Sequence, residues 1–554
     1  MAAMTPAQLS FAQLDQASLS AYQAGHIVQA MQLCAEALRR EPSNDRLKLR
    51  YSYFIDTLET SQFDPEIKKT ITLCLKDDKL DHQKFASMWA SLVITAPLYG
   101  FLFDPTIDDQ KYWRSIDALL NDDFFIDGLR RLTPVSIPIE RALIRLRRTL
   151  LQASAIEGRL RSKHLPLLCA LALQCYYNEY VWAESADETA LVNNLTPHDA
   201  ISIALIGAYK PLLSFPDAPV WPASHLREPM AGVLRAHITQ PLEERDIRAT
   251  IPSFSPITAG TSQDVQAMYE ENPYPRWRAA EVVPRQYDDV NLDWLTAGCG
   301  TGRPLTVIAR SFPNARFTAI DLSRASIAYA LRKTREAGAT NIEFRHGDIL
   351  HVADLKKDFD FIESSGVLHH MKNPEEGWKQ LLGCLRPGGR MQIGLYSRSA
   401  RDVVLKVRDY IAEKGYKADL DGIRQLRRDI MDLPDNHPLK SIARRRDFSS
   451  TSECRDLVFH VQEENYTIPD LARILDNLGL AFLGFKLPPS AQALYQARFP
   501  QDPAMRNLDN WATLEQANPL LFIGMYNFLC CRKNESESPR PECLILEKTG
   551  VLSH

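Results

Sequence analysis

The sequence has no hydrophobic run long enough to cross a lipid bilayer. The best candidate, residues 90–103, has 14 residues and contains Pro97, whereas a spanning helix needs about 20 apolar residues. The opening residues MAAMTPAQLS also lack the basic stretch and apolar core of a secretory signal. These absences predict a soluble, cytoplasmic protein that has no membrane partner.

An excess of charge of one sign and closely paired cysteines are also missing. The net charge is only −4 over 554 residues, which gives no general attraction to nucleic acid or anionic lipid. The ten cysteines include no C-x-x-C pair, and most stand in apolar segments such as PLLCALALQC. We therefore expect reduced thiols in the core, no metal site and no nucleic-acid partner.

Strand-like alternation is almost absent from the first 260 residues, where apolar residues recur at helical spacing. The segment AYQAGHIVQAMQLCAEALRREPSN places Gly25, Ala30, Ala37 and Pro42 at the intervals of a tetratricopeptide-like helix-turn-helix. In that pattern, glycine lies where two helices approach and the alanines form the packed face. No second copy follows at the 34-residue period, so we predict one irregular helical domain over residues 1–248. It serves packing, or it binds a protein partner.

A different pattern follows a linker rich in proline, serine and threonine, residues 249–290. Residues 291–533 alternate short apolar runs with helical stretches, which predicts parallel strands joined by crossover helices in a Rossmann-like α/β sheet. A charged helical stretch, residues 398–470, interrupts this domain, and residues 534–554 resemble a loose tail. The expected early strands are NLDWLTA, ARFTAID, NIEFRHG, FDFIESS and GRMQIGLYS.

The strongest chemical signal is the segment DWLTAGCGTGRPL, in which a strand ends in Gly298, Gly300 and Gly302 and then enters a helix. Glycine is needed in such a turn because the backbone bends sharply and comes close to a ligand. A dinucleotide site requires the spacing G-x-G-x-x-G, but Arg303 stands at the third glycine position. The turn therefore predicts that NAD does not bind.

Two carboxylates follow the next two strands. Asp321 ends ARFTAID, where it can accept hydrogen bonds from both hydroxyls of a ribose, and Asp348 in HGDIL suits the exocyclic amine of adenine. Each aspartate alone is typical of a helix N-cap or a turn. Together with the glycine turn, at the carboxyl ends of successive strands, they predict a nucleoside site.

These motifs, followed in order by FDFIESSGVLHHM and LRPGGRMQIGLYS, resemble those of class I S-adenosylmethionine-dependent methyltransferases. The segments CYYNEYVWAESADE, MYEENPYPRW and NPLLFIGMYNFL extend the resemblance to a bacterial group with a tetratricopeptide-type N-terminal region. The resemblance implies a seven-stranded sheet whose last strand is antiparallel, with LAFLGFKL and LLFIGMYNFLCC as strands six and seven. It also implies S-adenosylmethionine as cofactor.

Carried over to this sequence, the resemblance assigns the site residues. The three glycines face the methionyl part of the cofactor, Asp321 holds the ribose, and Ser364 lies under the sulfonium. The adenine-binding residues are Leu322, Asp348 and the backbone of Ile349. Thr296 departs from the pattern, because the family usually has an acidic residue there. From the segment MYEENPYPRW, Tyr269 and Arg276 are candidates for the methionyl carboxylate, if this segment is not merely a packed linker.

The methyl group of a sulfonium is already electrophilic, so in-line alignment of the acceptor is the main requirement. His369 and His370, just after the fourth strand, are candidates for a general base, or they pack at a helix start. We expect the insertion, residues 398–470, to close the cleft over the acceptor, with the helical domain outside the chemistry. The acceptor, a protein, a peptide or a small molecule, is not assigned. The alternative is a scaffold that binds the cofactor without transferring its methyl group.

Overall fold

A computed structural model describes residues 8–156, 158–224, 227–258, 260–280, 286–536, 538–541 and 543. The chain divides into two compact units, and each is built from several stretches of sequence. Unit 1 comprises residues 1–242, 278–284 and 415–455, and unit 2 comprises residues 243–277, 285–414 and 456–554. The expected division at residue 248 is therefore incomplete, because two later segments belong to the first unit.

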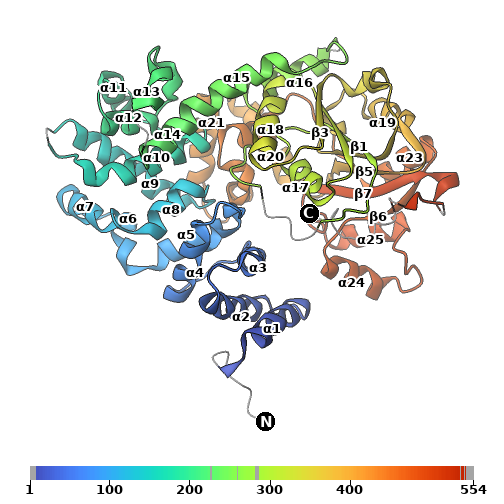
Figure 1. Cartoon of the computed structure of the whole chain (residues 1–554), viewed down its shortest axis with the longest axis horizontal. Coiled ribbons are helices and arrows are strands. Elements are labelled where there is room, and N and C mark those ends of the chain that lie inside the picture. The colour runs from blue at the N-terminus through green and yellow to red at the C-terminus, as the bar shows by residue number, and fades with distance from the viewer. Residues whose placement is uncertain are drawn as a thin grey trace. The chain divides into compact units, whose positions relative to one another are not determined.

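Unit 1 is helical in the part that the structure describes. Most of its helices begin at a Ser, Asn or Asp cap that accepts a backbone N–H, as in α1, α3 and α8. Its helices, blue to green in Figure 1, are α1 (Phe11–Gln23), α2 (Ile27–Arg40), α3 (Asp45–Ile55), α4 (Pro65–Leu75), α5 (Ala86–Thr95), α6 (Gly100–Phe103), α7 (Asp109–Ser115), α8 (Asp123–Arg131), α9 (Ile137–Ser154), α10 (Leu165–Tyr177), α11 (Ala186–Asn194), α12 (Ala200–Gly207), α13 (Trp221–Ser224) and α14 (Met230–Leu234).

The expected helix-turn-helix is formed by α1 and α2. Ala30 and Ala37 are fully buried, as predicted for the packed face. Gly25 has a different role from the expected one, because a Cβ there would meet no atom within 4 Å. Its φ of +80° shows that it is needed for the left-handed backbone of the turn, and not for close approach of the helices.

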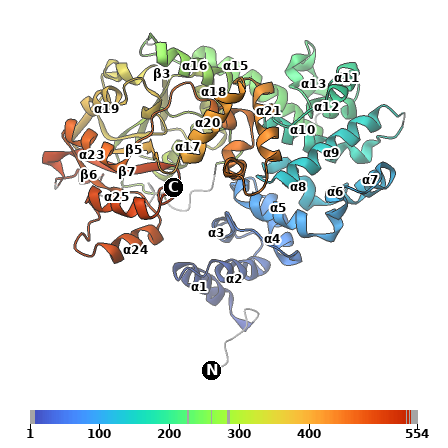
Figure 2. The ribbon, with the colours of Figure 1, turned by 180° about the vertical axis from the view of Figure 1, so that it is seen from behind.

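The middle of the expected insertion packs in unit 1. Helix α21 (Leu420–Asp432), orange in Figures 1 and 2, lies beside the helices of that unit. Both guanidinium Nη atoms of its Arg427 donate to the Glu140 carboxylate on α9, at 2.8 and 2.7 Å. Two buried charges require such a partner, so this pair fixes α21 on α9. The expected insertion is therefore divided between the two units, and its role in closing the cleft stays a prediction.

Unit 2 contains the predicted sheet. Its seven strands lie in the order β3-β2-β1-β4-β5-β7-β6, and β7 is antiparallel to both of its neighbours while the others pair in parallel. This confirms the expected Rossmann-like sheet of seven strands with an antiparallel last strand. The strands are β1 (Asp293–Ala297), β2 (Arg316–Asp321), β3 (Ile342–His346), β4 (Phe359–Ser365), β5 (Leu385–Tyr396), β6 (Leu480–Phe485) and β7 (Met525–Arg532).

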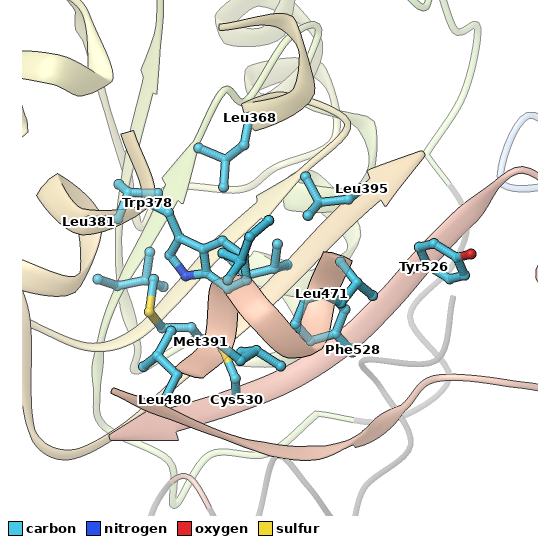
Figure 3. Packing of buried hydrophobic residues seen from close by; sticks show 14 of the residues in the cluster. Leu368, Trp378, Leu381, Met391, Leu395, Leu471, Leu480, Tyr526, Phe528 and Cys530 are labelled. Atoms are coloured by element: carbon cyan, nitrogen blue, oxygen red, sulfur yellow. The ribbon is translucent and has the colours of Figure 1, made fainter. Parts of the chain in front are cut away.

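Two apolar cores cover the two faces of the sheet. On one face, α17 and α18 pack with Trp294, Phe317 and Phe361 of the strands. On the other, α19, α23 and α25 pack around Trp378, Met391 and Phe528 (Figure 3). The helices of this unit are α16 (Gly260–Glu271), α17 (Arg303–Ser311), α18 (Arg324–Glu336), α19 (Pro374–Gly383), α20 (Asp402–Lys414), α23 (Ile468–Asn477), α24 (Pro489–Arg498) and α25 (Leu508–Ala517). Helices α15 (Gln240–Thr250) and α22 (Thr451–Phe459) cross the unit boundaries.

Part of the expected tail is attached to unit 2. The backbone N–H of Arg540 donates to the Gly388 carbonyl at 3.1 Å, and its guanidinium lies 2.9 Å from the Asp360 carboxylate. Cys543 is buried against β4, where its thiol donates to the Asp360 carbonyl, so the tail is not loose at these residues. Residues 537, 542 and 544–554 of the expected tail lie outside the described residues, as do 259 and 281–285 of the expected linker.

The cysteine and membrane expectations have simple outcomes. All ten cysteines are free and buried, as predicted. Within the described residues, no single helix has the length and apolar character of a membrane span. One pair, His82–Thr95 with Pro97–Phe103, meets both criteria together but is bent by 75°.

Candidate active site

A cavity of about 330 Å³ lies in unit 2 at the carboxyl ends of its strands. Its wall passes from Asp348 after β3 to Asp321 at the end of β2, and then to the glycine turn after β1. Beyond that turn it continues along Ser365, the last residue of β4, the following residues Gly366 and Val367, and Tyr396 of β5. This is the edge at which parallel α/β sheets bind their ligands.

The glycine turn has the backbone that the sequence predicts. Gly298 has a φ of +82°, and a Cβ on it would lie 2.3 Å from a methyl carbon of Val367. Gly302 has a φ of +74° and begins α17, where a Cβ would lie 2.9 Å from the Cβ of Ala330. Both positions therefore require glycine. Gly298 and Gly300 line the cavity, whereas Gly302 is not among its described lining residues.

Asp321 links β2 to the glycine turn. Its Oδ2 accepts the backbone N–H of Gly300 and its Oδ1 accepts that of Ser323, both at 2.8 Å. Removal from water raises the pKa of this carboxyl to about 6, although these backbone donors oppose the shift. Since each carboxylate oxygen has more than one lone pair, Asp321 retains capacity for hydroxyl donors of a ligand.

Asp348 forms the next polar position along this edge. Its Oδ1 accepts the N–H of Leu350 at 3.0 Å and caps the 3₁₀ helix Ile349–Leu355, which is the N-cap role considered from the sequence. Its own N–H donates to the Ser255 hydroxyl at 3.0 Å. Asp348, Ile349 and Leu322 all line the cavity, so the structure brings together the predicted adenine-binding residues.

The segment MYEENPYPRW crosses the glycine turn. The Tyr274 carbonyl oxygen lies 3.2 Å from the position of a Cβ on Gly300, and Trp277 Nε1 donates to the Thr301 carbonyl at 2.8 Å. Tyr269, Tyr274 and Pro275 line the cavity. The segment is therefore a wall of the site as well as a linker. Arg276 is not among the described residues that line this cavity.

The predicted site residue on β4, Ser364, does not line the cavity. Ser364 is fully buried, and its hydroxyl donates to the Ala297 carbonyl at 3.1 Å, inside the sheet. Side chains alternate between the faces of a strand, so its neighbours Glu363 and Ser365 face the cavity instead. The expectation that Ser364 lies under the sulfonium is wrong for its side chain.

Glu363 stands beside Thr296 in the β1–β4 register, and both side chains line the cavity. The buried Thr296 and Ser365 hydroxyls have no hydrogen-bond partner among the described residues. Buried polar groups rarely remain unpaired, which indicates that a polar ligand satisfies them. Glu363 places a carboxylate next to Thr296, the position where the methyltransferase motif has its acid. Burial raises the pKa of the Glu363 carboxyl.

The two candidate bases differ in position. His369 is fully buried, packs against Tyr396 with ring centroids 3.8 Å apart, and is not among the described lining residues. His370 lines the cavity, and its Nδ1 donates to the Gln462 carbonyl at 2.7 Å, which leaves Nε2 as an acceptor. Burial lowers the pKa of His370 to about 3, so it is a weak base at neutral pH.

A hydrogen-bond network connects the wall segment with the end of α22. The Tyr269 hydroxyl donates to Asp456 Oδ1 at 2.6 Å and lies 3.2 Å from His460 Nε2. His460 Nδ1 accepts the Gln462 N–H at 3.1 Å, so the neutral ring carries its hydrogen on Nε2 and donates to Tyr269. The Tyr269 hydroxyl already donates its hydrogen bond to Asp456. A methionyl carboxylate could accept this hydrogen bond only if it replaced Asp456 as the acceptor.

His370, Asp456 and His460 also have the composition of a metal site, with ligand atoms within 4.8 Å of one another. However, the two imidazole rings are stacked, with centroids 3.6 Å apart and planes 18° apart. A metal ion lies in the plane of each imidazole that binds it, so these nearly parallel rings cannot share one. The geometry favours a hydrogen-bond network, and the absence of a metal requirement stays a prediction.

The cavity is acidic. Its described lining includes four carboxylates, Asp321, Asp348, Glu363 and Asp456, and no lysine or arginine. The nearby Arg401 and Arg408 are both ion-paired with the buried Glu463 carboxylate. A ligand of this cavity is therefore one that carries hydrogen-bond donors or positive charge.

Sequence reasoning did not identify Glu363, Asp456, His460 or Tyr396 as site residues. Strand phase was the missing signal for Glu363, because Trp294, Thr296, Phe361 and Glu363 share one face of paired strands. Asp456 and His460 have no local signal, because folding brings them to His370 from about 90 positions further along the chain. Only the three-dimensional structure shows that proximity.

Comparison with known proteins agrees with this geometry. Residues 295–391 match the family model described as "Methyltransferase domain". The chain is 30% identical over 266 residues to an uncharacterized protein of a Synechococcus strain, covering 43% of this chain and 63% of that protein. It is 29% identical over 143 residues to a trans-aconitate 2-methyltransferase of Deinococcus radiodurans, covering 25% of this chain and 45% of that enzyme.

Among solved structures, PKMT2 from Rickettsia typhi in complex with AdoHcy aligns with a TM-score of 0.35 and 17% identity, covering 44% of this chain and 49% of that one. The chain spans between about a quarter and just under two thirds of the length of the first curated relatives it matches. The family match falls on the strands that carry the glycine turn and both aspartates. Residues 295–391 of unit 2 are therefore similar to a methyltransferase domain.

Proposed function

We propose that the protein transfers the methyl group of S-adenosylmethionine to an acceptor, which is a small molecule, a peptide or a protein. One observation carries this proposal. The glycine turn, Asp321 and Asp348 line a single cavity at the carboxyl ends of adjacent strands. Its acceptor-rich wall fits the donors of the cofactor, which are an adenine amine, two ribose hydroxyls and an α-ammonium group.

The nucleoside half of the cofactor fits the β2 and β3 side of the cavity. Asp321 would accept both ribose hydroxyls, with Leu322 beside the adenine. Asp348 and the backbone of Ile349 would read the exocyclic amine of the base. The backbone bonds that Asp321 and Asp348 already accept hold both carboxylates in place before a ligand arrives.

The methionyl half fits the β1 and β4 side. Gly298 and Gly300 leave room for it, and Glu363 beside Thr296 would accept the α-ammonium group in place of the missing motif acid. An ammonium group there favours the ionised form of Glu363, against the effect of burial. Arg276 remains our candidate for the methionyl carboxylate, while Tyr269 is assigned to Asp456 instead.

When bound, the cofactor supplies an electrophilic methyl group that needs no further activation. The protein residues therefore have to align the acceptor and exclude water. The wall formed by Tyr274 and Pro275 covers the glycine turn and keeps solvent from that side. His370 presents Nε2 to the cavity, where it would orient an acceptor through a hydrogen bond more readily than take its proton.

Turnover of labelled cofactor tests the proposal. The full chain is incubated with labelled S-adenosylmethionine and a cell lysate, and S-adenosylhomocysteine is measured. A methyltransferase forms S-adenosylhomocysteine and transfers label to either macromolecules or small molecules. The rival function, a scaffold that binds the cofactor without chemistry, gives binding and no turnover. Asp321→Ala is the matched control, because it removes a carboxylate of the cavity and should leave the sheet intact.

For unit 1 we propose a tetratricopeptide-like role in binding a protein partner in the cytoplasm. The observation that supports it is the α1–α2 hairpin, whose spacing follows that repeat and whose alanines are buried. Exposed apolar side chains at Tyr22, Ile27 and Val28 on the hairpin suit a protein surface. Affinity capture with Val28→Asp as the control would test it, and equal capture by both forms would contradict it.

A further inference from the structure

We propose that Ser255, through the backbone of Asp348, sets the preference of the cofactor site for a base that carries an amine, and that Gln266 and His346 hold the surface on which this base lies. The inference rests on the proposed function and adds the positioning residues of its adenine end. Ser255 and Gln266 belong to residues 249–290, which the sequence predicts as a linker.

The start of this segment continues the sheet beyond its edge strand β3. The His346 N–H donates to the Pro252 carbonyl at 2.9 Å, and the Phe254 N–H donates to the His346 carbonyl at 3.0 Å. These two bonds pair Ser253 with His346 in parallel. The pairing lies at the carboxyl end of β3, where the chain passes into the cavity wall at Asp348. The segment is therefore fixed beside the adenine end of the cavity.

Ser255 follows this pairing and binds the backbone of Asp348. Ser255 is 4% exposed, and its Oγ accepts the Asp348 N–H at 3.0 Å. Asp348 is itself 3% exposed, so loss of this acceptor would leave a buried N–H unpaired. The ring of Phe254 covers the preceding residue so closely that a Cβ on Gly347 would overlap it. Together these contacts fix the peptide from which the Asp348 side chain leaves.

The direction of the Asp348 carboxylate decides which base fits the proposed site. Its Oδ1 already accepts the Leu350 N–H at 3.0 Å, so the residue is held at both its backbone and its side chain. An ionised carboxylate only accepts hydrogen bonds, which suits the exocyclic amine of adenine. A base with an oxygen in that position would bring two acceptors together and leave both unpaired. Without the Ser255 hydroxyl, the Asp348 peptide would turn toward another acceptor, and this discrimination would weaken.

A second support acts on Leu322, which lines the cavity directly after Asp321. Gln266 Nε2 donates to the Leu322 carbonyl at 3.0 Å, and His346 Nε2 lies 3.0 Å from the same oxygen. A carbonyl oxygen only accepts, so the hydrogen of the neutral imidazole is on Nε2 and is donated to Leu322. Burial lowers the pKa of His346, which keeps the ring neutral. Two donors from different elements therefore fix the Leu322 peptide.

Helix α16 is held in place for this role. The Tyr269 carbonyl accepts the Ser323 hydroxyl at 3.1 Å, which attaches the end of α16 to the N-cap of α18. Val265 of α16 lines the cavity, and the next residue, Gln266, holds Leu322. The helix is therefore both a wall of the adenine end and a support of its backbone.

Two ligands that differ only at the base test the role of Ser255. S-adenosylhomocysteine carries the amine of adenine, and S-inosylhomocysteine carries an oxygen in its place. In calorimetry on the full chain, we expect the wild type to prefer S-adenosylhomocysteine by on the order of tenfold to a hundredfold. Ser255→Ala should reduce this preference by roughly threefold to tenfold, through weaker binding of S-adenosylhomocysteine. An unchanged preference in Ser255→Ala, or no preference in the wild type, would overturn the proposal.

Gln266→Met provides the contrast within the site. It removes a donor to Leu322 and leaves the support of Asp348, so it should weaken both ligands by a similar factor of roughly threefold to tenfold. Unchanged affinity of Gln266→Met for both ligands would contradict its role. The matched control is Ser311→Ala, a buried serine whose hydroxyl donates to the Val307 carbonyl within α17, and it should change neither affinity.

The melting temperature of each variant shows whether it folds. A serine with a purely structural role would lower the melting temperature and leave the preference between the two bases unchanged. If Ser255→Ala does not fold, Phe254→Leu decides, because Phe254 supports the same peptide and its loss should reduce the preference in the same direction. Absence of binding of both ligands to the wild type would instead overturn the proposed function on which this inference rests.

Discussion

At the residue scale, the site depends on carboxylates that the fold holds in place before any ligand binds. Asp321 is the clearest case, because two backbone N–H groups fix it between β2 and the glycine turn. Such bonds cost nothing further when the ribose arrives. The substitution Asp321→Ala should therefore cost affinity and leave the sheet intact.

We expect Asp321→Ala to weaken S-adenosylhomocysteine binding by on the order of tenfold to a thousandfold, because two charge-assisted hydrogen bonds are lost. Calorimetry measures this change. The exposed Asp402 on α20 provides a matched control, since its side chain is 66% exposed and pairs only along its own helix with Lys406. If Asp321→Ala and Asp402→Ala bind equally well, Asp321 is not part of the site.

The raised pKa of Asp321 predicts a pH dependence of binding. Burial raises this pKa to about 6, and ribose hydroxyls donate more strongly to the ionised carboxylate than to the protonated carboxyl. Binding therefore favours deprotonation, and affinity for S-adenosylhomocysteine should fall as the pH falls through about 6 and level off above pH 7. Titrations at several pH values measure it. In Asp321→Asn this step should be absent, and its persistence there would assign it to another group.

At the element scale, one local feature stabilises each unit. The turn between β1 and α17 stabilises unit 2, and the packing of α21 on α9 stabilises unit 1. We expect Gly298→Ala to lower the free energy of unfolding by about 1–3 kcal/mol, because the residue has a φ of +82° and its Cβ would overlap Val367. Denaturant unfolding measures it. Gly383→Ala on α19 is the control, since a Cβ there meets nothing within 4 Å. Equal stability of the two variants would contradict the account of this turn.

The Glu140–Arg427 pair predicts a second stability effect. Arg427→Met leaves the Glu140 carboxylate buried without its guanidinium, which should cost about 3–5 kcal/mol of unfolding free energy. The double substitution Glu140→Met with Arg427→Met should recover most of that loss. Thermal unfolding of the three proteins decides, and a neutral effect of the single change would show that the pair does not hold α21 in place.

Much of the fold at this scale was predictable from the sequence. The periodicity of FDFIESS gives β4 at its observed bounds, and the glycine turn and the two aspartates were expected together and line one cavity. Strand β5 begins at Leu385, four residues before the expected run, because the pair Gly388 and Gly389 hid its start. The position of Ser364 required the phase of alternation, which the motif alone does not give. The packing of α21 on α9 depends on tertiary contacts, which no local sequence pattern predicts.

At the scale of the whole molecule, the two units are not consecutive segments of the chain. Residues 415–455 belong to unit 1, where Ile423, Leu426 and Ile430 of α21 are fully buried. A variant that lacks residues 1–242 should therefore expose this apolar face and aggregate. A variant that lacks the same residues and has a short loop in place of residues 415–455 should stay soluble. Size-exclusion chromatography distinguishes the two. A soluble simple truncation would contradict the assignment of α21 to unit 1.

The central claim, that unit 2 binds S-adenosylmethionine through the cavity at its strand ends, is tested most directly by calorimetry on the full chain. The account predicts that S-adenosylhomocysteine binds at one site and competes with S-adenosylmethionine, and that NAD does not bind, because Arg303 stands where a dinucleotide site has glycine. Tight binding of NAD with no binding of S-adenosylhomocysteine would contradict it.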